Sequence, residues 1–173
     1  MKPPHTLALE SEARYGEVFG DLYEHSPWVI ANAYARVKSD SRFDDIAEFH
    51  RLLAATMLDA PEALQDALIK AHPMLAGKEA QEGKLTDFST GEQRSAGLNS
   101  CTNAEIERFN LLNKRYFDTF GFPYILAVKG RSKEEIVSDF ERRLRNDYRT
   151  ERAAALEQIN TIALIRIKDI YEQ

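Results

Sequence analysis

Residues 102–123 read TNAEIERFNLLNKRYFDTFGFP and contain the signals for both ends of one long helix. Thr102 and Glu105 form a capping box, in which the hydroxyl and the carboxylate each accept a hydrogen bond from a free backbone N–H. Gly121 can adopt the left-handed conformation that ends a helix, and Pro123 prevents the helix from resuming. Apolar residues between these signals recur every three to four positions, which predicts one buried helical face. The residues expected on that face are Ile106, Phe109, Leu112, Tyr116, Phe117 and Phe120.

The same helical pattern continues in both directions from this stretch. No alternating strand pattern and no internal repeat interrupts it. We therefore predict an all-α fold, a single compact domain of about seven or eight helices over residues 1–173, with residues 1–12 as a loose N-terminal segment. Further helices are expected to start at Ser26-Pro27, Phe43-Asp44 and Ala60-Pro61, at about Thr150, and at two more capping boxes, Ser89 with Glu92 and Ser132 with Glu135.

Composition limits the classes of partner. The formal net charge is -5, with 43% hydrophobic and 29% charged residues, which is typical of a globular chain and argues against general nucleic-acid binding. We interpret the basic run Arg142, Arg143 and Arg145, which acidic residues surround, as a solvated helix face. No apolar run approaches the roughly 18 residues of a membrane span. The single cysteine, Cys101, fits a reducing compartment, so we expect a cytoplasmic protein without a membrane or nucleic-acid partner.

Residues 70–100 form a long connection between helical patterns. Loops beyond about 12–15 residues are uncommon inside domains and are usually functional or disordered. His72 either complements the negative end of a helix dipole or acts as a general acid or base, because histidine changes charge near neutral pH. Ser89 and Glu92 either cap a helix or, with Gln93 and free N–H groups, hold a small anion.

Two other features allow both a structural and a functional interpretation. The apolar segment 122–130 is either a buried connection or a surface for a flat, hydrogen-bonding ligand, because buried backbone N–H and C=O groups need partners. Arg166 lies on the shoulder of an apolar helical stripe. Its guanidinium either extends to solvent or points into a cleft, where it would need a carboxylate.

Three motifs follow one another along the chain, with two shorter matches near its ends. They are His72-Pro73-x-Leu75-Ala76-Gly77-Lys78, Ser89-x-x-Glu92-Gln93-x-x-Ala96-Gly97-Leu98, and Phe120-Gly121-Phe122-Pro123-Tyr124-Ile125 with Ala127-Val128-x-Gly130, together with Glu24-His25-Ser26-Pro27-Trp28 and Ala163-x-x-Arg166. In this order they resemble the OHCU decarboxylases, in full the 2-oxo-4-hydroxy-4-carboxy-5-ureidoimidazoline decarboxylases. The resemblance spans roughly residues 15–170. Met74 stands where the family commonly has aspartate, and Tyr124 where phenylalanine is common.

The resemblance implies an all-α lyase that decarboxylates this compound to (S)-allantoin and CO2 without a metal or organic cofactor, in the last step from urate to allantoin. It implies that His72 is the catalytic acid or base and Glu92 its acidic partner. It also implies a small anionic ureidoimidazoline substrate, and some relatives are homodimers. The substrate-binding residues that it implies are Pro73, Ser89, Thr90, Gly91, Gln93, the backbone of Tyr124, Ile125, Leu126, Ala127 and Val128, and Arg166.

Two alternatives remain open from the sequence. One is a non-enzymatic all-α interaction module, which predicts a large exposed apolar patch and little dependence on His72. The other is a lyase of the same fold that acts on a different small carboxylate, which predicts the same site without activity on the urate-derived compound.

Overall fold

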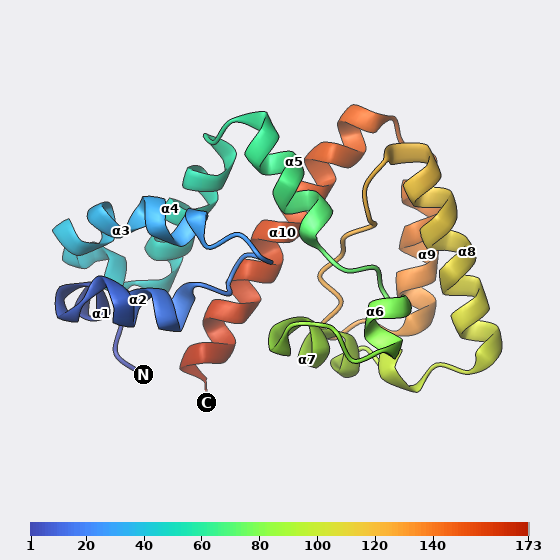
Figure 1. Cartoon of the computed structure of the whole chain (residues 1–173), viewed down its shortest axis with the longest axis horizontal. Helices are drawn as coiled ribbons and strands as arrows, with labels where there is room; N and C mark the ends of the chain where they lie inside the picture. Colours follow the sequence, from blue (N-terminus) through green and yellow to red (C-terminus); the bar gives the residue numbers. More distant parts are fainter. Residues whose placement is uncertain (173) are drawn as a thin grey trace. The chain divides into compact units, whose positions relative to one another are not determined.

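The computed structural model describes residues 1–172, apart from the side chain of Glu79. These residues form ten α-helices and two short 3-10 helices and no β-strand (Figure 1), so the all-α prediction is confirmed. The helices beyond the predicted seven or eight are short, such as the four residues of α6, and a single turn leaves no apolar period in the sequence. The elements are α1 Pro4–Glu10, α2 Glu12–Phe19, α3 Trp28–Ser39, η1 Ser41–Asp44, α4 Ile46–Leu58, α5 Glu62–Ala71, α6 Lys78–Gln81, α7 Asp87–Ser95, η2 Leu98–Ser100, α8 Asn103–Phe120, α9 Lys133–Arg143 and α10 Tyr148–Tyr171.

The described residues fall into two compact units, each with its own internal packing. Unit 1 contains residues 1–71 and the chain from Asn160 onward, and unit 2 contains His72–Ile159. Helix α10 begins in unit 2 and ends in unit 1. The single domain over the whole chain stays a prediction. None of the described helices is both long enough and apolar enough to cross a membrane.

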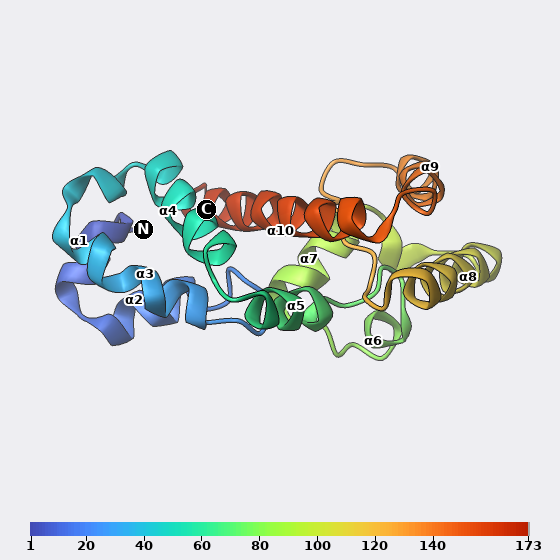
Figure 2. The same cartoon turned by 90° about the horizontal axis from the view of Figure 1, so that it is seen from above.

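Unit 1 contains α1 to α5 and the second half of α10. Helix α1 packs against α2 and α3, as Figures 1 and 2 show for the blue and cyan helices. The rings of Tyr15, Phe19 and Phe49 meet in the core of this unit, with the Phe19 and Phe49 centroids 4.9 Å apart. Aromatic rings at this separation stabilise the fold by more than the burial of their apolar surface alone.

The prediction of a loose segment over residues 1–12 is wrong. Residues Pro4–Glu10 form α1, and Leu7 and Ala8 on it are buried. Pro4 occupies the first helical turn, where its fixed φ favours a helix and its missing N–H costs nothing. Burial of the Leu7 side chain then holds the short helix in place.

In unit 2, α8 and α9 lie next to each other (Figure 1). The capping boxes predicted at Thr102 and Ser132 are both present, each with its two hydrogen bonds. Gly121 ends α8 in the left-handed region at φ 75°, as predicted. Tyr116 lies at the centre of an aromatic cluster, with its ring centroid 4.6–5.9 Å from the rings of Phe120, Phe122, Tyr124 and Phe140.

One residue of the predicted inward face of α8 points outward. Phe117 is 43% exposed, whereas Phe109, Leu112, Tyr116 and Phe120 are buried. The buried four are spaced by three, four and four residues, and Phe117 is turned about 100° away from Tyr116 because each helical residue advances by that angle. A single apolar residue on the exposed side of a helix is normal.

The capping box of α8 predicts a measurable loss of stability. Thr102→Ala removes the hydroxyl that accepts from the Glu105 N–H, so the free energy of unfolding should fall by about 1 kcal/mol in urea titrations. The matched control is Thr119→Ala in the same helix, where the hydroxyl only donates to the Arg115 carbonyl. That variant should stay within about 0.5 kcal/mol of the wild type, and equal losses for the two variants would contradict the role of the cap.

Candidate active site

His72 follows directly after α5 and begins unit 2. His72 is 8% exposed, so the imidazole is largely screened from solvent. The helix ends at Ala71, because Pro73 disfavours the α conformation in the residue before it. Burial of a histidine at a helix end gives a titratable group a defined position, which general acid–base chemistry requires.

Amide side chains from α7 and α8 hold the loop that follows His72. Gln93 accepts from the Ala76 N–H through Oε1 at 3.0 Å and donates from Nε2 to the Met74 carbonyl at 3.4 Å. Asn113 donates from Nδ2 to the carbonyl of Leu75 at 2.9 Å. Three consecutive residues of the loop, beginning two positions after His72, are therefore bound to side chains of the adjacent helices.

The loop also contains a strained residue. Ala76 has φ 49°, in the left-handed region that costs a residue with a Cβ roughly 1–2 kcal/mol. Its N–H is held by Gln93 and its C=O accepts from Gln81 Nε2 at 3.2 Å, so two hydrogen bonds offset the strain. The next residue is Gly77, where a Cβ would lie 2.9 Å from the Met74 Cβ. Strain of this kind persists where the surrounding structure over-determines it, often at functional sites.

Helix α7 starts earlier than predicted, and the capping box at Ser89 and Glu92 is wrong. The N-cap is Thr86, whose side chain accepts from the N–H of Ser89 at 3.3 Å, so Ser89 lies inside the helix. Thr86 and Ser89 both have a hydroxyl that can cap a helix, and the earlier of the two, Thr86, is the N-cap. Ser89 and Gln93 are buried on one face of α7, Glu92 beside them is half-buried, and Gly91 is exposed.

A cavity of about 300 Å³ lies next to α7 within unit 2. Of the residues predicted to bind substrate, Thr90 and Gln93 line it, together with Ala76, Arg94 and Cys101. Burial raises the pKa of the Cys101 thiol, which keeps it protonated at neutral pH. The cavity therefore places two predicted substrate residues beside the strained loop and offers no thiolate.

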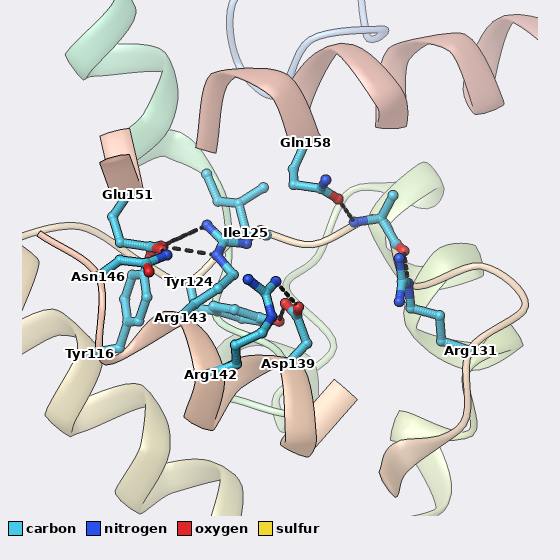
Figure 3. Close-up of polar contacts among 11 residues, drawn as sticks. Tyr116, Tyr124, Ile125, Arg131, Asp139, Arg142, Arg143, Asn146, Glu151 and Gln158 are labelled. Atoms are coloured by element: carbon cyan, nitrogen blue, oxygen red, sulfur yellow. Dashed lines mark hydrogen bonds and ion pairs between the residues drawn. The ribbon is translucent and has the colours of Figure 1, made fainter. Parts of the chain in front are cut away.

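The predicted ligand-binding segment from Tyr124 to Val128 is buried throughout and forms neither helix nor turn. Side chains supply several of its hydrogen bonds (Figure 3). Arg143 Nη1 donates to the carbonyl of Ile125 at 2.6 Å, and Gln158 Oε1 accepts from the N–H of Ala127 at 3.0 Å. In the described part of the chain, no hydrogen bond reaches the N–H or C=O of Leu126.

The prediction that Arg143 lies on a solvated helix face is wrong. Arg143 is 3% exposed, and its guanidinium pairs with Glu151, which is fully buried, at 2.8 Å. It also donates to the Tyr116 hydroxyl and stacks over the Tyr124 ring. Arg142 and Arg145 are exposed, as predicted.

A signal for Arg143 was present in the sequence. Ile136, Phe140 and Arg143 follow one another by four and three residues, so the arginine lies on the apolar stripe of α9. Glu151 and Gln158 carried no such signal, because both are polar residues in a helix that was predicted only from its apolar positions.

Arg166 belongs to unit 1 and is 1% exposed. Its Nη2 donates to Glu24 Oε2 at 3.0 Å, and its Nη1 donates to the carbonyl of Asp21 at 3.2 Å. The interpretation in which the side chain extends to solvent is wrong, and the carboxylate that a buried guanidinium needs is Glu24. Contact of Arg166 with substrate stays a prediction.

Comparison with known proteins places these features in a family. The family model described as OHCU decarboxylase matches residues 9–168. A 2-oxo-4-hydroxy-4-carboxy-5-ureidoimidazoline decarboxylase of Haloferax volcanii is 34% identical over 170 residues, which cover 95% of this chain and 96% of that protein.

Two solved structures are similar to this chain. The crystal structure of an (S)-allantoin synthase has a TM-score of 0.73 at 28% identity; the match covers 97% of this chain and 54% of that one. A structure of an OHCU decarboxylase in the presence of (S)-allantoin has a TM-score of 0.69 at 16% identity, with 94% and 100% covered. At that identity the second likeness supports the fold alone.

The hydroxyl of Tyr124 generates a pH-dependent prediction. It donates to Asp139 Oδ2 at 2.6 Å. Burial raises the pKa of the Asp139 carboxyl, but the hydrogen bond from Tyr124 and the contact with Arg142 outweigh it, so the pKa lies below its usual 3.8. A lowered folded pKa adds stability above the unfolded value, and this stability is lost as the pH falls through the folded value.

Tyr124→Phe keeps the ring, which stacks on Phe140, and removes the hydroxyl. The difference in free energy of unfolding between wild type and this variant should therefore be largest near neutral pH and shrink below pH 3.8. Urea titrations over this pH range measure the difference. A difference that stays constant into the acid range is incompatible with an ionised Asp139 as the acceptor.

Proposed function

Because the chain belongs to the OHCU decarboxylase family, we propose that it converts 2-oxo-4-hydroxy-4-carboxy-5-ureidoimidazoline to (S)-allantoin and CO2, the last step from urate to allantoin. The observation that carries the proposal is the match to a decarboxylase of this name along nearly the full length of both chains. The proposal includes a cytoplasmic location, a homodimer and no nucleic-acid partner.

The substrate can supply its own electron sink. When the bond from C4 to the carboxylate breaks and CO2 leaves, the electron pair forms a C4–C5 double bond, and the ring C=N takes up the displaced electrons and a proton. The C4 hydroxyl then loses its proton to become the carbonyl of allantoin, and C5 receives a proton. One carboxylate is released as CO2 and one net proton is consumed. Addition of the C5 proton from one face sets the (S) configuration.

In this scheme His72 is the acid or base that moves the proton at the C4 hydroxyl or carboxyl, and Glu92 orients the imidazole or the ureido group. The burial of His72 and the hydrogen bonds that fix its loop support this role. Glu92 is not part of a capping box, because the N-cap of α7 is Thr86 rather than Ser89. General acid–base catalysis typically raises the rate of the chemical step by about 10²–10⁴-fold. Fixed hydrogen-bond donors and acceptors around the substrate supply the rest of the rate enhancement.

The binding residues complete the proposed site. Pro73, Ser89, Thr90, Gly91 and Gln93 surround the substrate from the His72 loop and α7. The backbone from Tyr124 to Val128 contacts the planar groups, and Arg166 faces polar groups of the substrate. The N–H and C=O of Leu126, which form no hydrogen bond among the described residues, support the contact with the backbone, because buried backbone groups are almost always paired.

The test generates the unstable substrate from urate with the two preceding enzymes and follows allantoin by circular dichroism. Unassisted decay gives racemic product, so optical activity that requires this protein supports the proposal. A wild-type protein that leaves the product racemic rules out this substrate, and a different small carboxylate or a non-enzymatic role would then replace it.

His72→Asn should lower kcat by about 10²–10⁴-fold, because the amide cannot exchange a proton near neutral pH. Far-ultraviolet circular dichroism should show unchanged helix content. A variant with the full wild-type rate would remove His72 from the mechanism.

Glu92→Gln should lower kcat/KM while leaving the melting temperature close to that of the wild type, because the half-buried side chain keeps its size and loses only its charge. Glu82→Gln, on the exposed surface of the same unit, is the matched control and should leave both quantities unchanged. Equal kinetics for the two variants would show that the charge of Glu92 is not required.

A further inference from the structure

The buried segment around Leu126 is held from both sides by side chains that the family motifs do not include. Arg143 from α9 binds the carbonyl of Ile125, and Gln158 from α10 binds the N–H of Ala127 (Figure 3). The two anchored atoms belong to the two peptide groups that flank the Cα of Leu126. Each of these peptide groups therefore has one end bound to protein and one end, which belongs to Leu126, without a hydrogen bond in the described residues.

Peptide geometry couples the bound ends to the unbound ones. A peptide group is planar, and in the trans form its C=O and N–H point in opposite directions; the described chain contains no cis peptide bond. When Arg143 fixes the direction of the Ile125 carbonyl, it also fixes the direction of the Leu126 N–H. In the same way, Gln158 fixes the direction of the Leu126 carbonyl by holding the Ala127 N–H.

Arg143 is itself fixed on several sides. Its Nε donates to Glu151 Oε2 at 2.9 Å, and the second carboxylate oxygen of Glu151 accepts from Asn146 at 2.7 Å. Both members of the ion pair are buried, at 3% and 0% exposure of their side chains. A guanidinium with these partners cannot rotate without losing charge-assisted hydrogen bonds. The carbonyl that it binds is consequently held by a rigid donor.

We propose that Arg143 and Gln158 are positioning residues that aim the N–H and C=O of Leu126 at the substrate. The inference rests on the proposed function and adds residues that act through the backbone. One donor and one acceptor on the same residue complement the adjacent N–H and C=O groups of a ureido group or an imidazoline ring. Two fixed directions match such a planar group, so the substrate binds to backbone groups that need no further ordering, and this preorganisation strengthens binding.

The test compares two substitutions of Gln158, which is only half-buried. Gln158→Met keeps the length of the side chain and removes the acceptor, so kcat/KM on the enzymatically generated substrate should fall by about ten- to a hundredfold. Gln158→Glu keeps an oxygen acceptor for the Ala127 N–H and should retain most of the wild-type kcat/KM. The loss should appear mainly in KM, whereas partial unfolding would lower the active fraction and leave KM unchanged.

Amide hydrogen exchange gives a second readout that needs no catalysis. The Ala127 amide should exchange faster in Gln158→Met than in the wild type and in Gln158→Glu, while the amides of α8 keep their protection. Thr119→Ala in α8 is the matched control, because its hydroxyl donates to the Arg115 carbonyl in the same helix and does not touch the segment. It should leave KM within about twofold, since both Arg143 and Gln158 keep their hydrogen bonds to the segment.

The outcomes separate the inference from the proposed function. A wild-type protein that makes no optically active allantoin contradicts the proposed function and, with it, the positioning of this substrate by Arg143 and Gln158. An active wild type with an unchanged KM in Gln158→Met contradicts only the positioning role, as does an equal loss in Gln158→Met and Gln158→Glu. If Gln158→Met does not fold, Arg143→Lys is the second variant; it keeps a charge for Glu151 and shortens the reach to Ile125, and an unchanged KM there also overturns the inference.

Discussion

The buried ion pair between Arg143 and Glu151 is the interaction on which the arrangement of unit 2 depends. Removal of one partner from such a pair typically costs about 3–5 kcal/mol, because the other charge stays buried without compensation. The pair is also extended by neutral groups, since Tyr116 donates to Glu151 and Arg143 donates to Ile125. It therefore links α8, α9 and the start of α10 to a segment with no secondary structure of its own.

A second set of hydrogen bonds fixes the other half of the proposed site. The loop after His72 cannot form a helix because of Pro73, and it contains the strained Ala76. The side-chain amides of Gln93 and Asn113 form hydrogen bonds with backbone groups of this loop, which in a helix or strand would be paired with other backbone groups. Two parts of the proposed site, the loop after His72 and the segment from Tyr124 to Val128, thus consist of irregular backbone that side chains of regular helices hold in place. This division allows backbone atoms to face a ligand while the helices carry the stability.

Features that depend on interactions between residues close in sequence could be predicted from the sequence. The two capping boxes at Thr102 and Ser132 and the glycine at 121 are local signals, and all three act as predicted. Ser89 was misassigned because Thr86 offers the same chemistry three residues earlier, and only tertiary contacts decide between two such hydroxyls. The loose N-terminus was misassigned because α1 is too short to show an apolar period.

The site was predicted less completely, for a related reason. His72, Gln93 and Leu126 were named through motifs, and the structure shows that Gln93 on α7 holds the loop that follows His72. Arg143 was taken for a surface residue because charge composition does not reveal a partner eight positions away, although its place on the apolar stripe of α9 indicated burial. Gln158 could not be found from the sequence, because the group that it binds is a backbone N–H, which every residue type except proline would present at position 127.

The most direct measurement of the central claim is a crystal structure of this protein with (S)-allantoin bound. The account predicts that the N–H or C=O of Leu126 forms a hydrogen bond with the ligand and that the imidazole of His72 contacts the same molecule. A ligand that binds elsewhere, with Leu126 and His72 both out of reach, would contradict it.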